Sequence, residues 1–122
     1  HVVMTGEVDR DTVYAALHGF DLFVVPSLWE GFCNAAVEAM AAGLPILCSD
    51  IHTLHEVVGE AATYANPKAP EHMANVLLEL IKQGPGEWKR QGENARERAQ
   101  TRFTVQRTAE AYVESYLEVA HQ

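Results

Sequence analysis

Residues 26–45 of the sequence read PSLWEGFCNAAVEAMAAGLP, and this stretch decides the fold of the chain. It follows the run Leu22 to Val25, which is short, apolar and rich in β-branched and aromatic residues, so we expect a buried strand there. The small apolar residues from Asn34 to Ala42 then predict a helix. Gly43 suits the end of that helix, and Pro45 prevents it from continuing.

Two carboxylates flank the turn that joins this strand to this helix. Glu38 lies within a helix so apolar that it should be packed on nearly every side, where an unpaired carboxylate is costly. We therefore expect Glu38 at an opening or against a partner such as a ligand hydroxyl. Glu30 precedes the helix, and between them the first N–H groups of the helix and the side-chain-free Gly31 offer an anion site. The combination suggests a phosphorylated sugar.

These residues resemble the donor-binding motif of family 4 retaining glycosyltransferases, which have the GT-B fold. The match consists of a strand ending in Pro-Ser, the triplet EGF at residues 30–32, and the run EAMAAGLP at residues 38–45. Similarity extends to residues 5–8, 21–24, 56–61 and 102–104, and so covers essentially the whole chain. The resemblance implies glycosyl transfer with retained configuration from a UDP-, GDP- or ADP-linked sugar, without a metal or other cofactor.

The resemblance also implies a role for each residue of the motif. Glu30 would be the catalytic residue that contacts the transferred sugar, and Glu38 would bind the ribose hydroxyls of the donor. The other donor-binding residues would be Ser27, Gly31, Phe32, Cys33 and Asn34, with the N–H groups of residues 31–34 holding sugar and diphosphate. Many members have glycine where this chain has Cys33, whose side chain could narrow the sugar pocket and leaves the sugar's identity open.

The order of the predicted elements favours an α/β fold. We expect a Rossmann-like three-layer fold with a short parallel sheet of about four strands flanked by helices. The strands are predicted at residues 2–4, 22–25, 44–48 and 61–65, and the helices at 9–17, 34–42, 55–58, 71–82, 87–102 and 104–120. Residues 1–122 would form one incomplete nucleotide-sugar-binding domain, the C-terminal domain of a GT-B enzyme without its upstream part and its acceptor domain.

The last helix carries an apolar stripe that we expect to lie mostly in the core: Ala109, Tyr112, Val113, Tyr116, Leu117 and Ala120.

In the usual strand order, strands upstream of His1 would separate the strand at residues 2–4 from the strand at Leu22 to Val25. Without them the Leu22 strand has a bare apolar edge, so we expect a homodimer through that edge, or direct pairing with residues 2–4.

The composition narrows the choice of partners. The chain has 122 residues, with 17 acidic against 9 basic side chains and a net charge of −8, which argues against a nucleic-acid surface. The resemblance implies that an Arg and a Lys on the preceding segment neutralise the diphosphate. We see no transmembrane segment and no charged-then-apolar leader, so we expect a cytoplasmic protein that meets a membrane, if at all, peripherally through the missing half.

Other chemistries are less well supported by the sequence. His52, His55 and Glu56 are spaced like metal ligands, but no third strong ligand joins the histidines, so we expect no metal; His52 and Asp50 would rim the ligand cleft instead. Ser27 lacks the turn of a serine nucleophile. Cys33 and Cys48 are expected to stay reduced.

Two alternative functions remain open. The chain could be a noncatalytic nucleotide-sugar- or phosphate-binding module that works with a partner chain, or a fragment without activity of its own. In either case the nucleotide sugar and the missing acceptor domain, or a partner chain in its place, are the expected partners. We expect the isolated chain to be inactive in sugar transfer.

Overall fold

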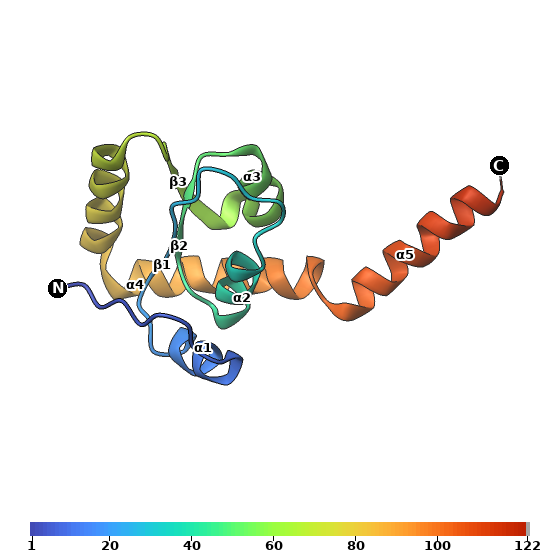
Figure 1. The fold of residues 1–122 in the computed structure, drawn as a ribbon, viewed down its shortest axis with the longest axis horizontal. Helices are drawn as coiled ribbons and strands as arrows, with labels where there is room; N and C mark the ends of the chain where they lie inside the picture. The colour runs from blue at the N-terminus through green and yellow to red at the C-terminus, as the bar shows by residue number, and fades with distance from the viewer. Residues whose placement is uncertain (122) are drawn as a thin grey trace.

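The computed structural model describes residues 1–121, and its elements follow the predicted order closely (Figure 1). They are α1 (Arg10–Leu17), β1 (Phe23–Val25), α2 (Asn34–Ala42), β2 (Ile46–Ser49), α3 (His52–Val58), the 3-10 turn η1 (Gly59–Ala61), β3 (Ala62–Ala65), α4 (Pro70–Arg102) and α5 (Val105–Ala120). Within these residues the strands form a three-stranded parallel sheet in the order β1-β2-β3. The predicted α/β class with a short parallel sheet is confirmed.

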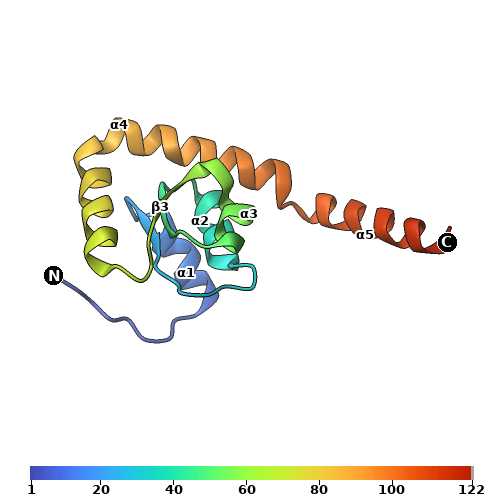
Figure 2. The same ribbon diagram turned by 90° about the horizontal axis from the view of Figure 1, so that it is seen from above.

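The central strand β2 is buried along its whole length because helices cover both faces of the sheet. Ile46 and Cys48 point into a cluster formed with α1, α2, α3 and the second part of α4. Leu47 points the other way, into a smaller cluster with the first part of α4. This alternation confirms the predicted three-layer arrangement, which Figures 1 and 2 show from two sides.

Helix α4 covers both faces because it is broken near its middle. Gly84 has φ 79° and ψ 176°, which is not helical, and Pro85 follows it. Proline disfavours a helical conformation in the preceding residue and has no N–H to donate, so the predicted break at residues 84–86 is confirmed. Across the break, the Trp88 indole N–H donates to the Leu80 carbonyl at 2.7 Å.

The strand predicted at Val2–Met4 is wrong. These residues are exposed and form an extended segment that pairs with no strand, so the sheet has three strands in residues 1–121 rather than four (Figure 2). An apolar run becomes a strand only where a neighbour's backbone groups pair with its own. The alternative in which residues 2–4 pair with β1 is therefore also wrong, and the homodimer stays a prediction.

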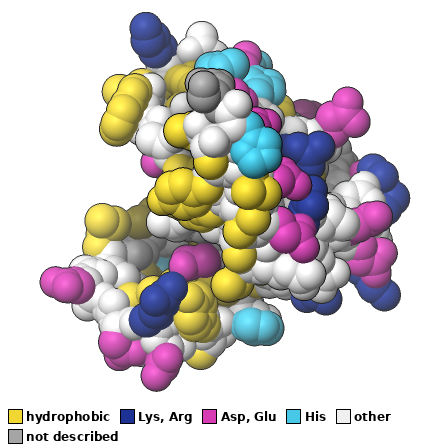
Figure 3. Space-filling model, turned by 90° about the vertical axis from the view of Figure 1, so that its right-hand side faces the viewer, with side chains coloured by type: hydrophobic (Ala, Val, Ile, Leu, Met, Phe, Trp, Pro, Cys, Tyr) yellow, Lys and Arg dark blue, Asp and Glu magenta, His cyan; other side chains and the backbone are white. Residues whose placement is uncertain are grey.

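The prediction that the stripe of α5 lies in the core is also wrong. Thr104 caps the helix as expected, its hydroxyl accepting the Arg107 N–H, but none of residues 105–120 is buried. Tyr112 is 64% exposed and Tyr116 73%, and the helix runs away from the sheet (Figure 1). Figure 3, seen from the α5 side, shows several hydrophobic side chains on the surface of this side of the molecule, with charged side chains around them. Periodicity predicts an amphipathic helix but not the surface that its stripe meets.

The second part of α4 packs directly on the end of α2. A side chain at Gly92 would overlap the carbonyl group of Gly43, so the two backbones can approach this closely only because residue 92 is glycine. Ala95 and Ala99, further along α4, continue this contact into the main core. Small residues on α4 therefore set its distance from α2.

We expect Gly92→Ala to lower the free energy of unfolding by about 2–3 kcal/mol, because the added methyl group must push α4 away from α2. Gly86→Ala is the matched control: it lies in the same helix, and a Cβ there meets nothing within 4 Å. The control should leave stability unchanged or raise it by up to about 1 kcal/mol. Urea unfolding followed by circular dichroism measures both, and equal stability of the two variants would contradict the packing.

Candidate functional site

Most of the predicted site residues lie at the carboxyl end of β1, where residues 26–33 lead into α2, and Asn34 and Glu38 lie in α2 itself. The carboxyl end of the strands is the edge at which open parallel sheets bind ligands. Ser49, at the end of β2, is fully buried and its hydroxyl donates to the Val25 carbonyl at 3.1 Å. This hydrogen bond therefore holds the start of the site loop, residues 26–33, against the central strand.

Glu30 is held both at its carboxylate and at its backbone. The Ser27 hydroxyl donates to Glu30 Oε1 at 2.6 Å, and the Thr53 hydroxyl, from the first turn of α3, donates to the Glu30 carbonyl at 3.1 Å. Ser27 and Glu30, both predicted as site residues, are thus brought into contact. Thr53 was missed by sequence reasoning, although it lies in the first helical turn after a buried strand, where a hydroxyl is a usable signal.

Glu38 lies at an opening, as its apolar helix suggests. Its side chain is 32% exposed and borders a hollow of about 320 Å³. The rest of the hollow is formed by α1 and the last turn of α2: Tyr14, Leu17, His18, Ala41 and Ala42. The Arg10 guanidinium, at the start of α1, lies 3.9 Å from Glu38 Oε1 and donates from Nε to the Tyr14 hydroxyl at 2.7 Å. Sequence reasoning missed Arg10.

The residue that precedes α2 has an unusual backbone conformation. Cys33 precedes the helix with φ 74° and ψ 70°, and among residues 1–121 it is the only residue other than glycine with a positive φ. Its side chain makes no capping hydrogen bond, and its carbonyl accepts the Ala36 N–H at 3.1 Å, so Cys33 satisfies neither of the first two N–H groups of α2, those of Asn34 and Ala35. The left-handed conformation favours glycine, so the Cys33 side chain occupies a backbone position that disfavours it.

The Cys33 thiol lies beside Glu30. Burial raises the pKa of the Cys33 thiol, and the Glu30 carboxylate adds to the rise. Cys48 is fully buried in β2, and both cysteines are free thiols. A neutral thiol at Cys33 therefore borders the candidate catalytic carboxylate at neutral pH.

The remaining predicted residues surround the same turn. Gly31 and Asn34 are exposed, and Trp29, 81% exposed, places its ring beside Gly31. The Phe32 ring packs edge-on against Phe103, with ring centroids 5.7 Å apart. Phe32 thus touches the residue that joins α4 to α5.

The histidines of α3 are engaged with separate acidic residues. His52 Nε2 lies 3.4 Å from Glu56, and His55 Nε2 lies 2.7 Å from Asp50. Within residues 1–121, no group of three or more His, Cys, Asp or Glu side chains is arranged to hold a metal ion. The same residues contain no helix that is both long and apolar enough to span a bilayer.

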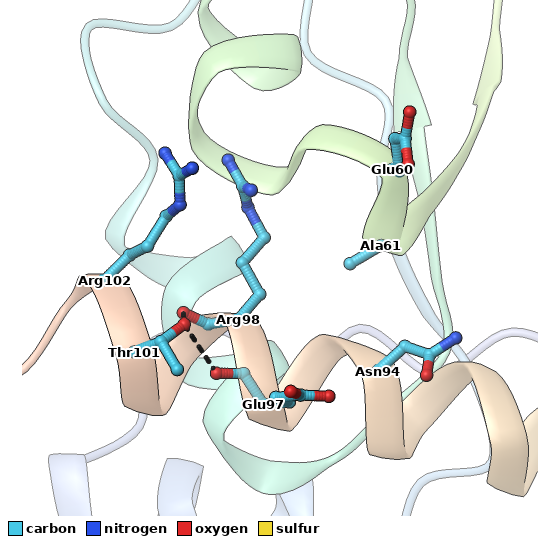
Figure 4. Close-up of a pocket in the computed structure, with 7 residues that line it drawn as sticks. All are labelled: Glu60, Ala61, Asn94, Glu97, Arg98, Thr101 and Arg102. Carbon is cyan, nitrogen blue, oxygen red and sulfur yellow. Dashed lines mark hydrogen bonds between the residues drawn. The ribbon is translucent and has the colours of Figure 1, made fainter.

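A second hollow, of about 340 Å³, lies between η1 and α4 (Figure 4). It is lined by Glu60, Ala61, Asn94, Glu97, Arg98, Thr101 and Arg102. Two acidic and two basic side chains meet there, and neither Glu30 nor Glu38 borders it. This hollow is separate from the candidate site.

Comparison with known proteins identifies the family of the chain. The family described as glycosyl transferases group 1 matches residues 1–98. The chain belongs to this family. A solved structure of sucrose-phosphate synthase from Thermosynechococcus elongatus superposes with a TM-score of 0.84 at 27% identity, over 96% of this chain and 30% of that one. The chain accordingly fits the C-terminal domain of a GT-B glycosyltransferase.

Relatives within the family carry several glycosyl-transfer activities. The MMP alpha-(1->4)-mannosyltransferase of Mycolicibacterium hassiacum is 40% identical over 105 residues, 84% of this chain and 25% of the relative. The glycogen synthase of Mycobacterium tuberculosis is 32% identical over 114 residues, 92% of this chain and 27% of the relative. The chain thus spans about a quarter of the length of these two relatives.

We expect Cys33→Gly to be more stable than Cys33→Ala by about 1 kcal/mol. Both variants remove the thiol, but only glycine adopts a positive φ without a steric penalty. Comparing the two variants with each other cancels the loss of the contacts that the thiol group makes. Urea unfolding measures the difference, and an alanine variant at least as stable as the glycine variant would disprove the strain.

We expect stability to fall as the pH rises above about 9. Burial raises the pKa of Cys48 from 9.0 to about 12 and, as the main cause, that of Tyr64 from 10.0 to about 12. Between these values the unfolded chain loses protons that the native chain keeps, so the free energy of unfolding decreases by up to about 1.4 kcal/mol per pH unit for each group. Urea unfolding from pH 8 to 11 tests this, and Cys48→Ala should show a shallower fall than the parent chain.

Proposed function

We propose that this chain is the donor-binding half of a retaining glycosyltransferase, which transfers a sugar from a nucleotide-diphosphate sugar to an acceptor. The observation that carries the proposal is the placement of Glu30 and Glu38 around the uncapped start of α2. Membership of the glycosyl transferases of group 1, and relatives named as mannosyltransferase and glycogen synthase, support sugar transfer.

The two carboxylates would bind different parts of the donor. Ser27 donates to one oxygen of Glu30, and the carboxylate keeps further lone pairs that would accept a hydrogen bond from a hydroxyl of the transferred sugar. Glu38 borders an open hollow, where its two oxygens would accept the ribose hydroxyls. The first N–H groups of α2, between the carboxylates, would hold the diphosphate.

The charge balance of the site suggests that other cations complete it. Arg10 is the basic side chain beside Glu38, and one guanidinium does not neutralise a diphosphate in a chain of net charge −8. We propose that the remaining cations come from a preceding segment, so that the isolated chain binds UDP-, GDP- or ADP-sugars only weakly, on the order of millimolar. Amide groups and arginines would then take the place of a metal ion.

The acceptor half would be a further part of the protein or a partner chain. The chain covers about a quarter to a third of its relatives' lengths. The exposed stripe of α5 and the unpaired edge of β1 are surfaces that such a part would cover. A homodimer through the β1 edge is the competing arrangement, and the molar mass in solution distinguishes the two.

We expect Glu38→Ala to abolish detectable binding of UDP, GDP and ADP, because a lost charge-assisted hydrogen bond weakens binding by roughly ten- to hundredfold. Glu30→Ala should keep nucleoside diphosphate binding and lose the affinity that the attached sugar adds. Glu56→Ala, which removes an exposed acid from α3, is the control for charge. NMR titration reaches the millimolar range, and unchanged affinities in Glu38→Ala would refute the assignment.

Sugar transfer itself tests the enzyme against the noncatalytic module. Supplied with the acceptor half, the protein should transfer sugar with retained anomeric configuration, which NMR of the product detects. Nucleotide-sugar binding by the complete protein without transfer would favour the noncatalytic module. Absence of nucleotide binding even in the complete protein would overturn the proposal as a whole.

A further inference from the structure

Two arginines on α4 cap the ends of two different helices. Arg96 donates from Nε to the Ala41 carbonyl at 3.3 Å and from Nη2 to the Ala42 carbonyl at 2.9 Å, at the end of α2. Arg98 donates to the last carbonyls of α3: its Nε to Val57 and its Nη2 to Glu56, each at 2.8 Å. In Figure 4 the Arg98 side chain extends from α4 toward the segment that precedes η1.

Each arginine packs against the glycine that ends the helix it caps. Gly43 has φ 76° and Gly59 φ 59°, conformations that glycine adopts readily. A Cβ at Gly43 would lie 2.8 Å from Arg96 Nη2, and a Cβ at Gly59 would lie 2.7 Å from Arg98 Cζ. The last carbonyls of a helix lack partners within it and carry the negative end of its dipole, so a guanidinium that donates twice is a strong cap.

The two capped helices lead to different carboxylates of the candidate site. Glu38 lies on α2, one turn before the carbonyls that Arg96 caps. Helix α3, which Arg98 caps, carries Thr53 in its first turn, and the Thr53 hydroxyl donates to the Glu30 carbonyl at 3.1 Å. Helix α4 is thus connected to each carboxylate by a separate short set of contacts: through Arg96 and α2 to Glu38, and through Arg98 and α3 to Glu30.

We propose that Arg96 and Arg98 are positioning residues that separately set the placement of Glu38 and Glu30. The inference rests on the proposed function for its consequence, since Glu38 would hold the nucleotide and Glu30 the sugar. Loss of Arg96 then affects nucleotide binding, whereas loss of Arg98 affects what the sugar adds to it. A general loss of stability cannot produce this division, because it affects both helices alike.

The first test needs no ligand. Amide hydrogen exchange measured by NMR should rise about tenfold or more at the end of α2 in Arg96→Gln, and at α3 and residues 27–31 in Arg98→Gln. The other helix should be unchanged in each variant. Arg90→Gln is the matched control, because Arg90 lies on the same helix and pairs with Glu87 within α4. Equal rises in both helices, or none, would overturn the inference.

The second test uses UDP, GDP and ADP and their sugar-linked forms in NMR titrations. Arg96→Gln should weaken nucleoside diphosphate binding three- to tenfold, with a smaller loss in Arg96→Lys, which keeps the charge. Arg98→Gln should leave that binding unchanged and reduce the added affinity of the sugar-linked form. If the parent chain binds but both variants lose affinity equally, the inference fails. If the parent chain and the complete protein bind none of them, the proposed function fails, and the exchange pattern still decides the inference.

Discussion

The close approach of α4 to the end of α2, at Gly92 and Gly43, is the contact on which the rest of the arrangement depends. No side chain intervenes there, so the distance between the two helices is set by backbone atoms, which cannot adopt alternative rotamers. This contact brings Ala95 and Ala99 into the main cluster and Arg96 and Arg98 to the carbonyls that they cap. The packing of the main core and the support of the site loop therefore both depend on this contact between α4 and α2.

The site itself combines rigid support with local strain. Ser27, Thr53 and Ser49 fix the loop after β1 by hydrogen bonds, and the loop ends at Cys33 in a conformation that side chains disfavour. Strained backbone persists only where the surroundings hold it, and such residues concentrate at functional sites. Here the surroundings are the start of α2 on one side and the loop fixed to α3 on the other.

The sequence predicts most of the local structure because local signals govern it. Helix α2 begins at Asn34 and ends at Ala42 as expected, since Gly43 and Pro45 act on their immediate neighbours. The two carboxylates of the candidate site, Glu30 and Glu38, were predicted from the same stretch. Val2–Met4 and the stripe of α5 were misplaced because their structure depends on which surface lies beside them, and this is not encoded within the segments themselves.

Arg10 and Thr53 show the same limit within the site. Each reaches the site from an element outside residues 26–45, and the packing of α1 and α3 brings them there. The roles of Arg96 and Arg98 could not be foreseen either, because a charged, polar helix reads as a solvated face. Helix capping between elements leaves no periodic signal in the sequence.

The break in α4 has a consequence for how this protein unfolds. One continuous segment supplies the cover of both faces of the sheet, and the Trp88 indole bridges its two parts. If one part of α4 moves away from its face of the sheet, it therefore pulls on the part of α4 that packs on the other face. Two hydrophobic layers that would be independent foldons in a chain with separate helices are coupled here, so the sheet is lost or kept as one cooperative unit.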